Sequence, residues 1–174
     1  AMKLGEARLE VDSPLLVDAA RDLHNGLDAL RRTVHGIHPR ELSDRGLIAA
    51  IETAAAQYGP HVTVRAPHKL PRIDDSVTAA AYFFTAEALT NAAKHAPQQP
   101  VSVLVTCDHT LNISVTDQGG GNARITPGGG LDGIQERIAA FGGSMEMTSP
   151  DGGPTTVTAR IPLLLFRGES GIAP

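Results

Sequence analysis

One stretch of the sequence, DQGGGNARITPGGGLDG (residues 117–133), contains seven glycines in seventeen residues. Glycine loses more backbone entropy on folding than any other residue, so a segment this rich in glycine disfavours a regular helix or strand. Such a segment is typical of a loop that moves, or of a backbone that lies very close to another group. The sequence therefore predicts a long loop here, and any fold for the chain must accommodate it.

Hydrophobic patterns on both sides of this loop predict an α+β fold. Apolar residues spaced three or four apart are typical of helices, and strict alternation is typical of strands. The predicted helices cover residues 13–37, 43–59, 74–96 and 131–143, and the predicted strands cover residues 61–66, 101–107, 111–116, 144–149 and 155–161. Because most strands are joined by short turns, we expect a two-layer α/β sandwich with a mixed, largely antiparallel sheet, preceded by a long N-terminal helix.

The first predicted helix carries a seven-residue apolar repeat. Its members are Leu16, Ala20, Leu23, Leu27, Leu30, Val34 and Ile37. Such a repeat is typical of a helix that pairs with other helices along a seam, and an ordinary amphipathic helix packed on its own domain is the alternative. Pro39 disfavours helix at the preceding residue, so we divide the chain into residues 1–39, a mixed domain at 40–166 and a tail at 167–174.

The composition excludes several classes of function. A formal net charge of −4 argues against a dedicated nucleic-acid-binding protein, which usually carries an excess of basic residues. The single cysteine, Cys107, excludes an internal disulfide and a cysteine-based zinc site. No signal peptide opens the chain, and the apolar runs near its ends are too short to span a membrane.

The predicted helix at 74–96 is almost entirely apolar, yet it carries one polar stripe. Glu87, Asn91 and Lys94 fall within an arc of about 60°, and His95 widens the arc to about 100°. Polar groups on a buried helix need partners, because each unpaired group costs several kcal/mol. The stripe predicts a cavity where Asn91 offers Mg²⁺ an oxygen ligand, Lys94 faces phosphate and Glu87 acts as a base. Alternatively, these side chains form salt bridges at a helix edge or face water.

The glycine-rich loop contains a second group of candidate ligand contacts. Asp117 directly follows a strand, and its carboxylate accepts hydrogen bonds, as an exocyclic amine such as that of adenine requires. Gly119 and Gly121 allow a ring to lie close to the backbone. The glycines at 128–130 precede the helix that begins at Leu131, and free N–H groups at a helix start bind phosphate.

The order of these features resembles a known ATP-binding domain. The phrases EALTNAAKHA, DQGGG and GGGLDGIQERI resemble the N, G1 and G2 boxes shared by sensor histidine kinases, Hsp90-type chaperones, gyrase and MutL. Further resemblance to the histidine kinases that signal to LuxR/NarL-type response regulators is carried by GIHPRELSDRGLIAAI, GLDGIQERIAAFGG and SPDGGPTTVTARIP. The resemblance runs from about residue 12 to residue 162 and implies a Bergerat-type fold that binds ATP and Mg²⁺.

The resemblance assigns roles to individual positions. It implies that Glu87 assists the chemistry and that Asn91 binds Mg²⁺. The implied nucleotide contacts are Asn91, Lys94 and His95 near the phosphates, Asp117, Gly119, Gly121 and Thr155 near adenine, and Gly128, Gly130, Leu131 and Gly133 at the lid and phosphate end. The chain departs from the family pattern at Pro154, where glycine is usual, and at Gln118, where an acid or asparagine is common.

The phosphoacceptor histidine of such a kinase is not evident in the sequence. Asn25 follows His24, where the resemblance calls for an acid. Thirteen residues separate His24 from His38, which corresponds to roughly 20 Å of one helix rather than a helical hairpin. We therefore expect residues 13–37 to be the second helix of a dimerisation hairpin, with the acceptor histidine upstream of this chain.

The resemblance implies a protein histidine kinase that transfers the γ-phosphoryl group of ATP to histidine and then to an aspartate of a LuxR/NarL-type response regulator. It implies a homodimer in the full-length protein and no nucleic-acid partner. We expect the cytoplasmic part of a sensor, with any membrane contact made by segments outside this chain. The alternatives are a serine kinase that switches an anti-sigma partner, and a degenerate module that binds nucleotide or dimerises without chemistry.

Overall fold

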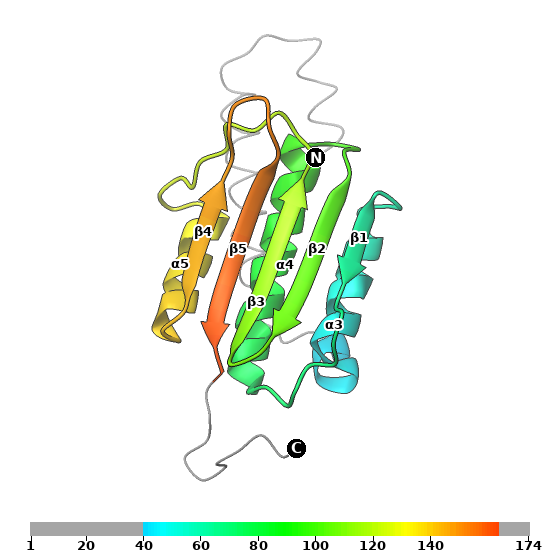
Figure 1. The fold of residues 1–174 in the computed structure, drawn as a ribbon, viewed down its shortest axis with the longest axis vertical. Helices are drawn as coiled ribbons and strands as arrows, with labels where there is room; N and C mark the ends of the chain where they lie inside the picture. Colours follow the sequence, from blue (N-terminus) through cyan, green and yellow to red (C-terminus); the bar gives the residue numbers. More distant parts are fainter. Residues whose placement is uncertain (1–39, 164–174) are drawn as a thin grey trace, which may run out of the picture. The chain divides into compact units, whose positions relative to one another are not determined.

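The computed structural model describes residues 40–163, which form three helices and five strands (Figure 1). The predicted helix at 13–37, with His24 and its apolar repeat, and the predicted tail at 167–174 lie outside the described residues. The elements in chain order are α3 (Arg40–Ala56), β1 (Val62–Arg65), α4 (Asp75–His95), β2 (Val101–Cys107), β3 (Thr110–Asp117), α5 (Gly130–Ala140), β4 (Ser144–Thr148) and β5 (Thr155–Pro162).

The five strands form one sheet in the order β1-β2-β3-β5-β4, with the three helices packed on one face (Figure 1). β1 runs parallel to β2, and these two strands are connected through α4. The remaining neighbours are antiparallel. The predicted two-layer sandwich with a mixed, largely antiparallel sheet is therefore confirmed.

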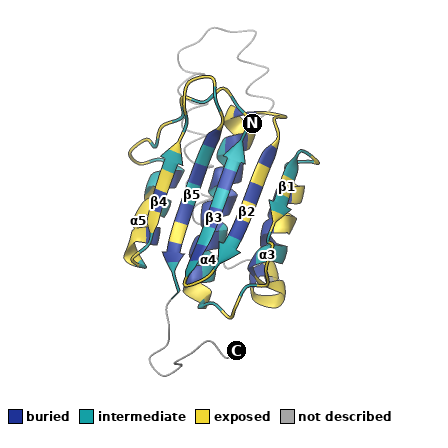
Figure 2. Ribbon diagram, in the orientation of Figure 1, coloured by how far each residue is buried: buried dark blue, intermediate teal, exposed yellow. Residues whose placement is uncertain are grey.

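Alternation along the strands builds the core between the sheet and α4 (Figure 2). In β3, Leu111, Ile113 and Val115 are buried and face the helices, while the residues between them lie on the outer face. The helix contributes large side chains such as Phe84 and Leu89 together with many buried alanines. Full burial of one such large apolar side chain stabilises the fold by about 1.5–3 kcal/mol.

The first described helix differs from the continuous helix predicted at 43–59. α3 begins at Arg40 and is interrupted at Gly46, whose φ of 81° and ψ of 176° are not helical. Glycine takes a positive φ without the steric cost that other residues incur. The chain thus contains two short helical segments joined by a bend that hydrophobic periodicity does not predict.

Candidate functional site

The polar stripe of α4 extends from the middle of the helix to its last turn. Glu87 and Asn91 are half-buried, whereas Lys94 and His95 are exposed. A cation in the last turn of a helix also interacts favourably with its dipole, so Lys94 has a structural reason to be there. Glu87 and Asn91 are one turn apart and share a helix face, so they are the stripe's best candidates for contact with a ligand.

The start of α5 lies directly against Glu87. A Cβ atom added to Gly130 would lie 1.9 Å from the Glu87 Oε1 atom, so no larger residue fits without movement. The α5 N-cap is Gly129, which makes no side-chain capping hydrogen bond. The first N–H groups of a helix lack intrahelical partners and favour negative charge. The fold therefore brings the predicted base and the predicted phosphate-binding helix start together.

A double-mutant cycle tests this contact. We expect Gly130→Ala to push the Glu87 carboxylate aside and to lower affinity for Mg-ATP, because the added methyl group occupies the space that the carboxylate fills. Truncation in Glu87→Ala removes the clash, so the two mutations should couple by more than about 0.5 kcal/mol. Thermal unfolding and nucleotide titration of both single variants and the double variant measure this coupling, and additive effects would contradict the contact.

The loop before α5 is also held by a side chain. The Gly128 N–H donates to the Asp132 Oδ2 atom at 2.8 Å, and Gly128 has a φ of 74°. The Gly129 N–H donates to the Thr126 carbonyl oxygen at 2.9 Å. Leu131 is buried and anchors the helix start in the core. Gly133, by contrast, has open space where a Cβ would lie.

Asp117 and Thr155 form a cross-strand pair at the end of the sheet. The register of β3 and β5 sets them directly opposite each other, on the face that the helices cover. Directly opposite residues have Cβ atoms about 4.5–5.5 Å apart. Although Pro154 stands where the family pattern has glycine, Thr155 is still in register with Asp117. The two residues are well placed to contact one ligand.

The glycine loop passes from Asp117 over the C-terminal end of α4. The Gly119 N–H donates to the Asp117 Oδ1 atom at 2.9 Å. A Cβ on Gly119 would lie 2.8 Å from the Ala96 Cβ atom, so this loop needs glycine for its close approach to the helix. Since Glu87 and Ala96 are nine residues apart, about 14 Å of α4 connects the two predicted ligand-binding ends.

Sequence reasoning missed Ser149, which lies between β4 and β5. The Ser149 Oγ atom accepts a hydrogen bond from the Ala123 N–H at 2.8 Å and shares another with Thr155 Oγ1 at 2.8 Å. The sequence pattern places Ser149 at the end of the predicted strand 144–149, before the turn PDGGP, and assigns it no role. Its place within one of the phrases that resemble the kinases was the available signal.

The described residues offer no other obvious chemical centre. No group of three or more His, Cys, Asp and Glu side chains in residues 40–163 is arranged to hold a metal ion. Burial raises the pKa of the Cys107 thiol, with Asp108 adding to the effect, so this thiol is a poor nucleophile at neutral pH. A hollow of about 710 Å³ lies between α3 and the segment joining β1 to α4, away from every predicted site residue.

Between residues 40 and 163, no helix is both long and apolar enough to cross a bilayer.

Comparison with known proteins gives a consistent set of similarities. Residues 78–165 match a family model described as histidine kinase-, DNA gyrase B- and HSP90-like ATPase. The sensor histidine kinase MctS of Rhizobium johnstonii is 30% identical over 163 residues, covering 87% of this chain and 35% of MctS. The oxygen sensor histidine kinase NreB of Staphylococcus carnosus is 31% identical over 146 residues, covering 79% of this chain and 42% of NreB.

Two further matches extend this picture. The sensor histidine kinase YxjM of Bacillus subtilis is 26% identical over 145 residues, covering 83% of this chain and 32% of YxjM. The chain therefore spans between a third and about two fifths of the curated relatives it matches. Among solved structures, the histidine kinase domain of the Erythrobacter litoralis EL346 blue-light activated histidine kinase matches with a TM-score of 0.52 and 19% identity. That match covers 65% of this chain and 57% of the other, and it supports the fold.

Proposed function

The chain belongs to the histidine kinase-, DNA gyrase B- and HSP90-like ATPase family and contains the ATP-binding catalytic domain of a sensor histidine kinase, and we propose from its geometry how this domain holds Mg-ATP for phosphoryl transfer to a histidine. The observation that carries the proposal is a pair of contacts along α4. Gly119, which is bonded to Asp117, lies against the C-terminal end of the helix, and the start of α5 lies against Glu87 in its middle.

The adenine end of the proposed site is built on the last residue of β3. The Asp117 Oδ1 atom already accepts from the Gly119 N–H, so its Oδ2 atom accepts from the exocyclic amine of adenine. Thr155 supplies a hydroxyl group directly across the sheet. Gly119 allows the backbone to lie close to α4, and Gly121 lies in the part of the loop beneath the adenine ring. This arrangement suits adenine because the exocyclic amine of the base can donate to the carboxylate.

The phosphate end lies between the stripe of α4 and the loop at 128–130. Backbone N–H groups at the start of α5 hold phosphate oxygens, as helix N-termini do elsewhere. Lys94 and His95 face the phosphate chain, and Gly128, Leu131 and Gly133 form the lid and its hinge into the helix. Glu87 accepts the proton that the attacking imidazole loses.

Mg²⁺ fits this donor set through Asn91. Mg²⁺ in phosphoryl-transfer sites commonly takes one or two protein oxygens and completes its shell with water and phosphate. Asn91 is half-buried beside Glu87 and offers one protein oxygen to the ion. Residues 40–163 contain no group of three or more His, Cys, Asp and Glu side chains arranged for a metal, so a Mg²⁺ site here would take few ligands from the protein, as such sites commonly do. A Mg²⁺ ion held there would neutralise charge on the phosphates, and the contribution of Glu87, Asn91 and Lys94 would be chiefly positioning.

We expect Asn91→Ala to weaken ATP binding about tenfold in the presence of Mg²⁺ and to leave metal-free binding nearly unchanged. The amide oxygen is a ligand for the ion and not for the nucleotide, so its loss matters when the ion is present. Calorimetric titration with Mg²⁺ and with EDTA measures both affinities. Asn112→Ala is the matched control, because Asn112 lies on the outer sheet face. Equal losses with and without Mg²⁺ would make Asn91 structural.

The partners proposed for the whole protein follow the named relatives. MctS, YxjM and NreB are sensor histidine kinases, which supports a response regulator as the acceptor of the phosphoryl group. The phrases quoted above favour a regulator of the LuxR/NarL type and a homodimeric kinase. We also propose a cytoplasmic location, because the phosphoryl donor is ATP. We propose that residues 1–39 are part of the dimerisation hairpin and that residues 40–166 are the catalytic domain.

A further inference from the structure

Two loops that are distant in sequence are joined beside the proposed adenine site. The first is the glycine loop at 118–123, which follows β3, and the second is the turn at 149–153, which connects β4 to β5. Their backbone hydrogen bonds run from Gly152 N–H to Gly120 O at 2.9 Å and from Asn122 N–H to Ser149 O at 3.2 Å. Asn122 Nδ2 also donates to Asp151 Oδ1 at 3.2 Å. The glycine loop is therefore held in place by the β4–β5 turn.

Ser149 is the residue that connects this loop contact to the proposed site. Its Oγ atom accepts from the Ala123 N–H and bonds the Thr155 hydroxyl, each at 2.8 Å. A serine hydroxyl has one proton and two lone pairs, so both hydrogen bonds can be made at once. Thr155 is 9% exposed and lies opposite Asp117, so a continuous chain of contacts links the glycine loop, Ser149, Thr155 and Asp117.

We propose that Ser149 is a positioning residue for nucleotide binding, which sets the Thr155 hydroxyl and the glycine loop at the distance from Asp117 that adenine requires. This inference rests on the function proposed above. Ser149 acts through Thr155 and the Ala123 backbone rather than by touching the phosphates. Loss of the Ser149 hydroxyl releases Thr155 and the Ala123 backbone at the adenine end. The phosphate end, which is built on α4 and α5, keeps its structure.

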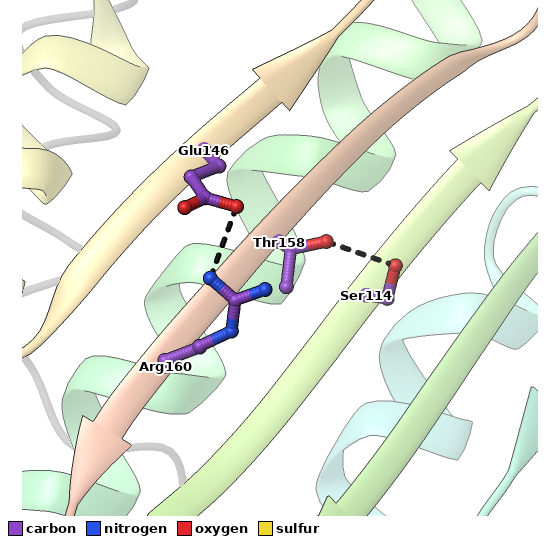
Figure 3. A network of polar contacts seen from close by, with 4 residues as sticks. All are labelled: Ser114, Glu146, Thr158 and Arg160. Atoms are coloured by element: carbon purple, nitrogen blue, oxygen red, sulfur yellow. Dashed lines mark hydrogen bonds and ion pairs between the residues drawn. The ribbon is translucent and has the colours of Figure 1, made fainter.

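The outer face of the sheet provides a matched control for this hydroxyl pair. Ser114 Oγ and Thr158 Oγ1 also form a serine–threonine hydrogen bond, at 3.2 Å between β3 and β5 (Figure 3). The neighbouring Arg160–Glu146 ion pair, at 3.0 Å, marks this face as polar and solvent-accessible (Figure 3). Ser114→Ala therefore removes the same type of hydroxyl pair, here between β3 and β5, on the face away from the helices.

The test is calorimetric titration of the full chain with ADP, ATP and GDP in the presence of Mg²⁺. We expect Ser149→Ala to weaken ADP and ATP binding by a similar factor of about 5–20, because a hydrogen bond is lost and a partner is left unsatisfied. GDP should lose less, so the preference for adenine over guanine falls. Ser149→Thr, which keeps the hydroxyl, should bind ADP within about threefold of wild type. Ser114→Ala should match wild type within twofold.

Thermal unfolding separates positioning from a purely structural role. We expect Ser149→Ala to lower the melting temperature somewhat more than Ser114→Ala, because it removes the bond from the Ala123 N–H as well as a hydroxyl pair, while Ser149→Thr keeps both the melting temperature and the ADP affinity near wild type. Wild-type ADP affinity in Ser149→Ala, or an equal loss in Ser149→Thr, would overturn the positioning role while the proposed function stands. A wild-type chain that binds neither ADP nor ATP would instead overturn the proposed function.

Discussion

Asp117→Asn is expected to weaken ADP binding by about 10- to 150-fold, the equivalent of the 1.5–3 kcal/mol typical of a hydrogen bond to a charged group. The Asp117 Oδ1 atom accepts from the Gly119 N–H at 2.9 Å. An asparagine that keeps this bond through its carbonyl oxygen must turn its NH₂ group toward the adenine amine. Two donors then face each other, so the variant loses an attraction and gains a repulsion.

The chain supplies a matched control for this substitution at Asp108. Its Oδ1 atom accepts from the Thr110 N–H at 2.8 Å, which is the same side-chain-to-backbone geometry two residues along the chain. Asp108 lies in the turn between β2 and β3, at the opposite end of the sheet from Asp117. Calorimetry should therefore find wild-type ADP affinity in Asp108→Asn. Unchanged ADP affinity in Asp117→Asn would remove this carboxylate from the adenine site.

Local patterns were sufficient to predict the sheet and its helices. In β2 and β3, alternating apolar residues mark the buried face, because successive side chains of a strand point to opposite faces. In α4, the run of apolar residues between Asp74 and Pro97 predicted a buried helix, and the structure has the helix at Asp75–His95. These signals are contained within each segment, so the sequence of the segment is enough to read them.

The tertiary contacts of the candidate site were not predictable in this way. Glu87 and Gly130 are 43 positions apart, and Ala123 and Ser149 are 26 positions apart. Periodicity describes the face of one element and carries no information about which loop lies against it. The bend at Gly46 was missed for a related reason, because a glycine inside a helical pattern is compatible with both a straight helix and a break.

Gly121→Ala is expected to lower the free energy of unfolding by about 2–4 kcal/mol and ADP affinity by at least about tenfold. Gly121 has a φ of 71°, a conformation that costs a residue with a Cβ atom about 1–2 kcal/mol. The added Cβ would also lie 1.8 Å from the Pro150 carbonyl oxygen, a backbone atom that cannot rotate away. Relief of this clash requires the glycine loop to separate from the β4–β5 turn, which breaks the contacts made by Ser149.

Gly120→Ala distinguishes this clash from a general effect of losing glycine in the loop. A Cβ on Gly120 would meet no atom within 4 Å, and its carbonyl oxygen can still accept from the Gly152 N–H. We therefore expect Gly120→Ala to melt within about 2 °C of wild type, whereas Gly121→Ala melts roughly 10 °C lower. If both variants melt and bind ADP like wild type, the two loops do not touch in solution. If both lose stability equally, the glycines serve loop flexibility rather than the close approach of Gly121 to Pro150.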